Sequence, residues 1–379
     1  MKLVDEFRDV AVARRLVDEI RQRATRRWVL MEVCGGQTHS LLRNGIDAAL
    51  ADVVELIHGP GCPVCVTPAE DIDLACQLAQ RPEVILSSFG DMLRVPGNAG
   101  SLLDAKTRGA DVRMVYSPLD AVALAQREPQ RQIIFFAVGF ETTAPTTALA
   151  VLQAERLGLE NFSLIVSHVR VLPAMELLMG ASDNRVQGFL AAGHVCTVTG
   201  FAAYDDFVRE FQVPVAVTGF EPVDLLVGIR ECVTQLEAGR VEATNCYGRS
   251  VRRSGNADAQ RVIEQAYAIK DGPWRGFGIV PRGVLRLRPE LQRFDATQRS
   301  GVIEPRPCLF NECRAPDVLA GRIKPPECRH FGASCVPETP LGAPMVSSEG
   351  ACAAYYRYAG QHSPNDQPLP RRRTLSGFG

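Results

Sequence analysis

Short apolar runs alternate with amphipathic stretches between Trp28 and about Glu237. Most runs lead into a Gly or Pro loop and then into a helical pattern. They are rich in Val, Ile and Phe, and they read WVLMEV, VVELI, EVILSSF, VRMVYS, QIIFFAV, FSLIVS and VPVAVTG. Strands that are buried on both faces read as continuous apolar runs, so this alternation predicts parallel sheets with helices on both faces.

The chain is long enough for two or three domains with cores of their own. We predict an α/β protein with two parallel-sheet domains, the first over residues 1–125 and the second over 126–240. After about Arg240 the pattern loosens into loops, and we expect a third, cysteine-rich domain over residues 241–360. Residues 361–379 are polar and are expected to form a disordered tail.

Charge and hydropathy exclude several classes of function. The net charge is −1, and basic residues are scattered except for Arg371, Arg372 and Arg373, so no footprint for nucleic acid is present. The first 24 residues carry charges throughout and are expected to form an amphipathic helix rather than an export signal. No apolar stretch is long enough for a membrane helix. We expect a cytoplasmic protein, in which the twelve cysteines serve as metal ligands, reactive thiols or core residues.

The first chemical motif, MEVCGGQTHSLLRNG, follows the first apolar run. A cysteine at the carboxyl end of a parallel strand lies where open α/β sheets bind ligands, which makes Cys34 a candidate reactive or liganding thiol. Thr38 is expected to cap the next helix, whose dipole would lower the pKa of the thiol. His39 is a candidate ligand or proton carrier. The alternative is a buried cysteine at a strand end with a histidine that caps a helix.

The second motif is Cys62-Pro-Val-Cys65 within HGPGCPVCVTPAED. Two thiols at this spacing beside a helix start form either a reversible dithiol/disulfide pair or a soft-metal chelate. Thr67 is expected to be the N-cap of that helix, with Glu70 completing a capping box. Because both cysteine loops follow strands, we expect them at one edge of the same sheet, with Cys34 sharing a cleft with the pair.

A third group of cysteines lies far from these loops, in a stretch rich in Gly, Pro and Arg. Cys313, Cys328, Cys335 and Cys352 have the spacing C-x14-C-x6-C-x16-C. Four thiolates suit a [4Fe–4S] cluster or a zinc ion, although the close cysteine pairs of structural zinc sites are absent. Two disulfides are a further reading, which a reducing cytosol disfavours.

Other candidates are weaker. Glu141, in VGFETTAPTT, is expected in the first turn of a helix, as a general acid or base, a ligand to hard cations, or only a charge that matches the helix dipole. Cys308 and His330 rank below the four C-terminal cysteines as ligands. The cysteines without a partner at ligand spacing are read as small core residues, and they are Cys76, Cys196, Cys232 and Cys246.

At this point the residues resemble a known family, the hydrogenase maturation factor family HypD. The resemblance covers the chain up to about Tyr358. It rests on the four C-terminal cysteines and on five long motifs, CGGQTH, HGPGCPVCV, SFGDMLRVPG, VGFETTAPTTA and MVSSEGACAAYY. Motifs this long, in this order, leave little room for chance.

The resemblance implies a cytoplasmic scaffold that works with a small partner, HypC. The pair would carry the iron of the [NiFe]-hydrogenase active site while cyanide, supplied through HypE and HypF, and carbon monoxide are added. It implies that Cys34 is a ligand of the Fe(CN)2CO unit and that Cys62 and Cys65 are a redox-active pair. The four C-terminal cysteines, Cys313, Cys328, Cys335 and Cys352, would hold a [4Fe–4S] cluster in a third domain.

One departure limits the inference. Relatives often carry a second cysteine where this chain has Ala315, so an additional disulfide relay is not assumed. Two other classes of function stay open at this stage. One is an iron–sulfur-dependent disulfide reductase, and the other is a zinc-stabilised binding protein without a redox role.

Overall fold

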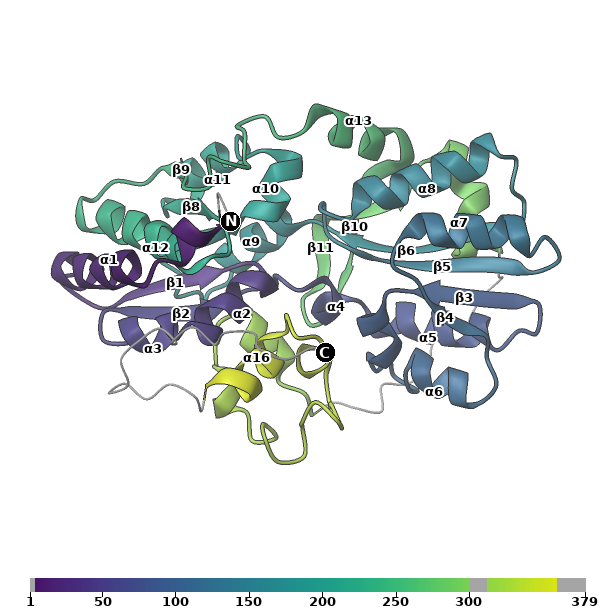
Figure 1. Cartoon of the computed structure of the whole chain (residues 1–379), viewed down its shortest axis with the longest axis horizontal. Helices are drawn as coiled ribbons and strands as arrows, with labels where there is room; N and C mark the ends of the chain where they lie inside the picture. The colour runs from purple at the N-terminus through teal and green to yellow at the C-terminus, as the bar shows by residue number, and fades with distance from the viewer. Residues whose placement is uncertain (1–3, 300–311, 360–379) are drawn as a thin grey trace.

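Two α/β units lie side by side in the computed structural model, which describes residues 4–299 and 312–359. Residues 312–359, the C-terminal segment, pack beneath the first unit and the place where the two units meet (Figure 1). The first unit is built on a five-stranded sheet with the strand order β2-β1-β7-β8-β9, and the second on a six-stranded sheet with the order β10-β11-β6-β5-β3-β4.

The first sheet is parallel throughout. Its strands are β1 (Trp28–Glu32), β2 (Val54–His58), β7 (Gly188–Ala192), β8 (Val215–Thr218) and β9 (Ala243–Asn245). Side chains alternate between the two faces of a strand. Leu30 therefore packs with α1 (Val10–Arg23) and α12 (Pro222–Glu237), whereas Met31 packs with α9 (Val171–Met179) and α11 (Tyr204–Phe211).

The second sheet is parallel except at one edge. Its strands are β3 (Val84–Ser88), β4 (Val112–Met114), β5 (Gln132–Gly139), β6 (Phe162–Val169), β10 (Tyr267–Trp274) and β11 (Gly278–Leu287). β10 and β11 form an antiparallel hairpin that joins the sheet at β6. Phe135 packs with α7 (Pro118–Arg127) and α8 (Ala144–Arg156), and Phe136 packs on the opposite face with α5 (Ala69–Ala79) and α6 (Leu102–Thr107).

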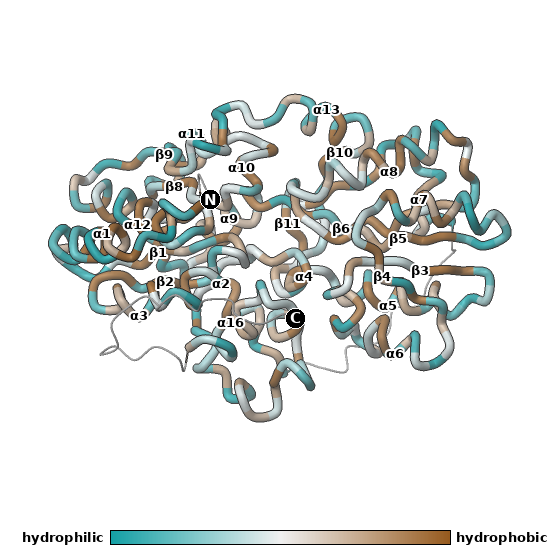
Figure 2. The backbone as a smooth tube through the Cα atoms, viewed as in Figure 1, coloured by the Kyte–Doolittle hydropathy of each residue, from teal (hydrophilic) through white to brown (hydrophobic). Residues whose placement is uncertain are grey.

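Shorter elements complete the two units. They are α3 (Ile46–Leu50), α10 (Gly193–Thr199), α13 (Ala257–Ala266) and α14 (Ala296–Arg299), with 3-10 turns at Asp5–Arg8, Gly90–Arg94 and Pro289–Phe294. The central strands of both sheets are mainly hydrophobic, whereas the outer loops are largely hydrophilic (Figure 2). In the part of the chain that the structure describes, no helix has the length and apolar character needed to cross a membrane.

The predicted fold class is confirmed for the two α/β units, and each of the seven apolar runs overlaps a strand. The prediction that the chain loosens into loops after Arg240 is confirmed for residues 246–256 but wrong for the residues beyond them, where α13 and the β10–β11 hairpin form. Strand β7 was also missed, since its sequence GFLAA is short and has no β-branched residue.

The boundary expected near residue 125 does not divide the two sheets. β3 and β4 lie before it, yet β3 pairs with β5 in the second sheet, and β7, β8 and β9 return to the first. The start expected at residue 241 is wrong for the same reason, because β9, β10 and β11 belong to the sheets. Apolar runs reveal strands but not their neighbours, so an interleaved chain path escaped the pattern.

The C-terminal segment contacts both units. It contains α15 (Ala315–Leu319), α16 (Ala351–Tyr358) and the 3-10 turns Pro325–Glu327 and Ala343–Met345. Leu319 joins an apolar cluster with residues of the first sheet, whereas Ala343 and Val346 join the core of the second. The predicted tail 361–379, with its three arginines, and Cys308 lie outside the described residues.

Candidate functional site

Cys34 stands at the carboxyl end of β1 and is the N-cap residue of α2 (Gly35–Arg43). Its backbone is extended, and its carbonyl accepts hydrogen bonds from the N–H groups of Gln37 (2.9 Å) and Thr38 (3.1 Å). The prediction that Thr38 caps this helix is wrong. Thr38 lies inside the helix, and its hydroxyl donates a hydrogen bond to Glu32. This acceptor was not recognised in the sequence, because Glu32 is part of the apolar run WVLMEV.

The second cysteine loop is in direct contact with the first. The N–H of Gly35 donates to the carbonyl of Gly61 over 2.9 Å. A side chain at Gly61 would place its Cβ 2.2 Å from the backbone nitrogen of Cys34, so only glycine allows this approach. The expected adjacency of the two loops at one sheet edge is confirmed by these backbone contacts.

Cys62 and Cys65 form a disulfide, and both are buried. Cys62 is the N-cap of a single helical turn, α4 (Pro63–Val66), and its sulfur accepts from the N–H of Cys65 (3.3 Å). The next helix, α5, begins after Pro68 rather than at the predicted cap Thr67. The Thr67 hydroxyl instead donates to the carbonyl of Pro63 (2.9 Å) and closes α4.

Burial raises the pKa of the Cys34 thiol to about 12, and the charges of Glu349 and Glu32 add to the effect. The expected lowering of this pKa by the helix dipole is therefore wrong. Desolvation and two nearby carboxylates disfavour the thiolate more than a helix N-terminus stabilises it. A cation bound at Cys34 would reverse the balance, because positive charge stabilises the thiolate.

A buried carboxylate organises the turn that carries Cys34. Glu32 is fully buried, and its Oε2 accepts from the N–H of Cys34 (3.0 Å). Its Oε1 accepts from Nδ1 of His58 (2.6 Å), at the end of the neighbouring strand. Neither residue was a predicted site residue. The available signal was a charged side chain at the end of an apolar run, directly before the cysteine motif.

The C-terminal segment covers the start of α2. Nδ1 of His39 lies 3.3 Å from the carbonyl oxygen of Ser348, and its Nε2 lies 3.2 Å from the hydroxyl of Tyr358. Glu349 lies so close to Gly35 that a Cβ there would be 2.4 Å from the Glu349 carbonyl oxygen. Both ring nitrogens of His39 therefore hold the C-terminal segment, and Glu349 is a residue of the Cys34 surroundings that the motif reading missed.

Glu141 lies in the turn after β5, three residues before α8, and not in the first turn of a helix as predicted. It is buried, and its carboxylate accepts from the N–H of Val171 (3.2 Å). Burial raises its pKa to about 6, against the attraction of Arg170. The buried Cys196 thiol has a pKa raised by burial and then by the charges of both Glu141 and Cys34. The ends of β1 and β5 therefore lie near each other across the junction of the units.

The four C-terminal cysteines gather in one neighbourhood. Burial raises the pKa of Cys352 well above its ordinary value, and the charges of the other three thiols add to the shift. The sulfur of Cys335 also accepts from the N–H of Leu341 (3.4 Å). Among the described residues, no three potential ligands are arranged as a metal site. Four neighbouring thiols with a backbone donor nonetheless fit the donor set of an iron–sulfur cluster.

His330 was ranked below the cysteines as a ligand, and its ring is engaged by neighbours. Nδ1 is 2.8 Å from the hydroxyl of Ser334, and Nε2 accepts from Nε of Arg329 (2.9 Å). Nε2 also lies 3.4 Å from a carboxylate oxygen of Glu312. A role as ligand would require these contacts to break.

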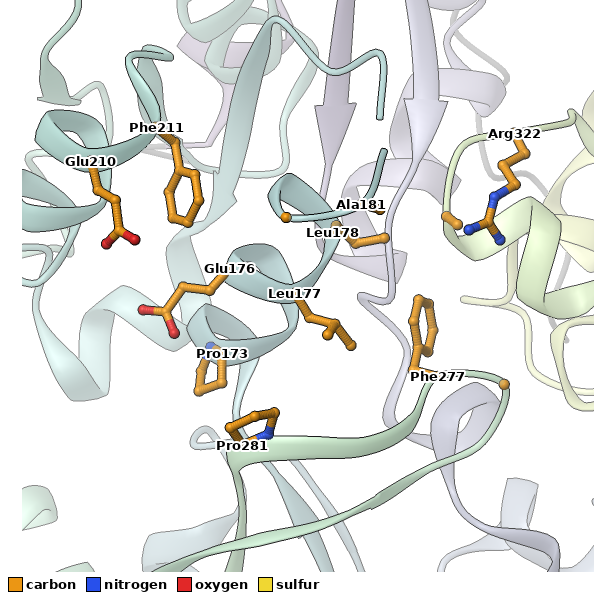
Figure 3. A pocket seen from close by; sticks show the side chains of 13 residues that line it. Pro173, Glu176, Leu177, Leu178, Ala181, Glu210, Phe211, Phe277, Pro281 and Arg322 are labelled. Atoms are coloured by element: carbon orange, nitrogen blue, oxygen red, sulfur yellow. The ribbon is translucent and has the colours of Figure 1, made fainter. Parts of the chain in front are cut away.

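The described residues line several cavities. One of about 470 Å³ lies beside α2, where the rings of His194 and Phe220 stack with centroids 3.8 Å apart. Another of about 650 Å³ is apolar over much of its wall, with the carboxylates of Glu176 and Glu210 at one end (Figure 3). None of the predicted site residues lines this second cavity.

The molecule is thus a two-unit α/β protein in which the loops that carry Cys34 and the Cys62–Cys65 disulfide touch each other near the place where the units meet. A family model named HypD and described as "Hydrogenase formation hypA family" matches residues 11–359. The "Hydrogenase maturation factor HypD" of Escherichia coli (strain K12) is 44% identical over 371 residues, which are 96% of this chain and 100% of that protein. The chain therefore belongs to the HypD family of hydrogenase maturation factors.

Two Azotobacter relatives agree. The "Hydrogenase expression/formation protein HupD" of Azotobacter chroococcum mcd 1 is 46% identical, over 95% of this chain and 98% of the relative. The "Hydrogenase maturation factor HypD" of Azotobacter vinelandii is 47% identical with the same coverage of both chains.

Proposed function

We propose that this hydrogenase maturation factor is a scaffold on which the Fe(CN)2CO unit of the [NiFe]-hydrogenase active site is assembled. Cys34 would bind the iron together with a thiol of a small HypC-type partner. Cyanide would come from HypE, with HypF acting before it. The observation that carries the proposal is the placement of Cys34 at the junction of the units, in contact with the Cys62–Cys65 loop and under the C-terminal segment.

The residues around Cys34 suit a transient metal ligand. Its thiol keeps its proton in the free protein, because burial and two carboxylates raise its pKa. Iron would displace that proton, and a thiolate is the soft donor that an iron with cyanide and carbon monoxide ligands prefers. The carboxylate of Glu32 accepts a hydrogen bond from the backbone N–H of Cys34. The backbone that carries the thiol is therefore fixed before the metal arrives.

Cys313, Cys328, Cys335 and Cys352 would hold a [4Fe–4S] cluster as a resident cofactor. When bound, such a cluster supplies or accepts single electrons. The chain's own contribution is a pair of nearby cysteines, Cys62 and Cys65, which can exist as a disulfide or as two thiols. This pair would be the redox-active group closest to the Cys34 loop.

A complementation experiment tests the proposal. In a bacterium that lacks its own factor of this family, this chain should restore [NiFe]-hydrogenase activity, and Cys34→Ser should fail to do so while folding normally by circular dichroism. Cys246→Ser is the matched control, because Cys246 lies at the end of β9, at the far edge of the first sheet. Full activity with Cys34→Ser would reject Cys34 as the iron ligand.

The Cys62–Cys65 disulfide favours one alternative, an iron–sulfur-dependent protein disulfide reductase. A reductase would turn over disulfide substrates catalytically without a partner. A scaffold would instead form a stoichiometric complex with another maturation protein. With reduced methyl viologen supplied as the electron donor, steady-state thiol release from a small disulfide by the isolated protein, lost in Cys65→Ser, would support the reductase.

A further inference from the structure

A chain of buried polar groups begins at paired positions of two neighbouring strands. Glu32 and His58 are register partners at the carboxyl ends of β1 and β2. They are 0% and 2% exposed, and Nδ1 of His58 is 2.6 Å from Oε1 of Glu32. Burying a carboxylate and an imidazole costs free energy that two apolar residues at these positions would avoid, so their presence calls for a reason.

At one end, the chain fixes the turn of Cys34. Glu32 accepts from the N–H of Cys34 (3.0 Å) and from the hydroxyl of Thr38 in the first turns of α2. One carboxylate therefore determines both the backbone position of Cys34 and the direction of the helix that follows.

At the other end, the chain reaches the helix that carries Cys352. Nε2 of His58 is 3.2 Å from the hydroxyl of Tyr355, and the two rings pack edge to face with centroids 5.2 Å apart. The same hydroxyl is 3.4 Å from a carboxylate oxygen of Asp47, which pairs with Lys324 (3.3 Å). Tyr355 lies three residues after Cys352 in α16, so both residues share one side of the helix.

We propose that Glu32, His58 and Tyr355 are positioning residues that couple the placement of Cys34 to the helix that carries Cys352. A shift of α16 moves the Tyr355 hydroxyl, and a packed, hydrogen-bonded interior passes the shift to Glu32 rather than absorbing it. A metal cluster bound by the C-terminal cysteines would restrain α16. Through the hydrogen-bonded chain it would also fix the backbone position of Cys34. The relevance to iron binding rests on the proposed function, whereas the coupling concerns this chain alone.

The first test removes one oxygen atom. Tyr355→Phe keeps the ring but loses the hydroxyl, and Tyr356→Phe is its control, since Tyr356 is 45% exposed on the same helix. The alkylation rate of Cys34 by iodoacetamide, read by peptide mass spectrometry, should rise about fivefold in Tyr355→Phe, as expected when a local opening loses one net hydrogen bond. The rate should stay unchanged in Tyr356→Phe, and equal rates in the two variants would overturn the proposal.

The second test asks whether Tyr355 acts through His58. Tyr355→Phe should add nothing to the alkylation rate in a His58→Gln background, because the route to Cys34 is already broken. Independent, additive effects would contradict the chain. If His58→Gln does not fold, amide hydrogen exchange at Cys34 is measured in Tyr355→Phe instead. We expect exchange about fivefold faster than in the wild type. Unchanged exchange would overturn the proposal.

These readouts do not depend on iron. If Cys34 proves to bind no Fe(CN)2CO unit, the proposed function fails while the coupling of Cys34 to α16 stands. If the alkylation and exchange tests fail, the coupling of Cys34 to α16 is wrong and Cys34 is positioned by its own turn. That outcome leaves the proposed function untouched.

Discussion

Cys34 shows at the residue scale why the position of a thiol does not determine its reactivity. A helix N-terminus contributes about 0.3–1 kcal/mol in favour of a thiolate. The shift of the Cys34 pKa from 9.0 to about 12 amounts to roughly 4 kcal/mol in the other direction. The motif CGGQTH locates the thiol, but the Glu349 carboxylate that acts on it comes from a segment far away in the chain, and the motif does not show the burial of the thiol.

Removing the charge of Glu349 should make Cys34 more reactive. Glu349→Gln lowers the pKa of the thiol, because a nearby negative charge disfavours the thiolate. At neutral pH we expect alkylation about threefold faster, since the gain in thiolate is partly offset by its lower intrinsic nucleophilicity. The rate is measured by mass spectrometry, with the exposed Glu338→Gln as control. An unchanged rate would show that the Glu349 carboxylate does not act on Cys34.

Glu141 gives a pH-dependent contribution to stability. Burial raises its pKa from 4.5 to about 6, so the folded state binds this proton more tightly than the unfolded chain does. Its contribution is complete below about pH 4.5 and is lost as the pH rises through about 6.

Glu141→Gln should therefore raise the free energy of unfolding by about 2 kcal/mol at pH 7.5 and have little effect near pH 4. Urea unfolding at the two pH values measures the difference, with the exposed Glu160→Gln as control. A gain that is equal at both pH values would contradict the buried, neutralised carboxyl.

At the scale of elements, the sequence was informative about strands and poor about their ends. Continuous apolar runs mark all seven predicted strands, because strands covered on both faces have no polar side. The caps were predicted less well. Thr38 and Thr67 both look like N-caps in the sequence, yet Cys34 takes that position at α2 and Pro68 takes it at α5. Residue preferences for N-cap positions are local. They do not predict that Gly61 allows the loop after β2 to pack against the loop of Cys34.

Gly61 is the element-scale feature most open to test. In Gly61→Ala the new Cβ would lie 2.2 Å from the backbone of Cys34, so the loops after β1 and β2 must separate. We expect a loss of about 1–3 kcal/mol in urea unfolding, the usual cost of overpacking. Gly248→Ala is the control, since its Cβ would meet no atom within 4 Å. Equal stability of the two variants would mean that the loops do not touch.

At the scale of the whole molecule, the chain crosses three times between the two sheets, from β2 to β3, from β6 to β7 and from β9 to β10. A linear reading of the sequence assigns neighbouring segments to one domain, which placed the boundary at residue 125 between strands that pair. The interleaved path brings the ends of β1 and β5 together from distant parts of the sequence. The motifs could be listed from the sequence, but their meeting place required the topology.

The C-terminal segment should depend on its cysteines. Cys328→Ala and Cys335→Ala should each lose iron and sulfide, about four of each per chain in the anaerobic wild type, because both thiols belong to the proposed cluster. Limited proteolysis within residues 312–359 should become faster, since the segment would keep its hydrogen bonds and apolar contacts to the two units but lose the cross-link that a cluster would form between its four cysteines. Cys232→Ala, in the core of the first unit, is the control for the metal analysis. Full iron and sulfide in both variants, or zinc in the wild type, would reject the cluster.

Infrared spectroscopy of the anaerobically purified protein with its co-purifying partner tests the central claim most directly, because iron-bound cyanide and carbon monoxide absorb where proteins are almost silent. We predict such bands in the wild type and their loss in Cys34→Ser, with the iron and sulfide of the C-terminal segment retained. A serine hydroxyl is too hard and too weakly acidic to replace the thiolate. Bands that persist undiminished in Cys34→Ser, or that are absent from the wild type, would contradict the account.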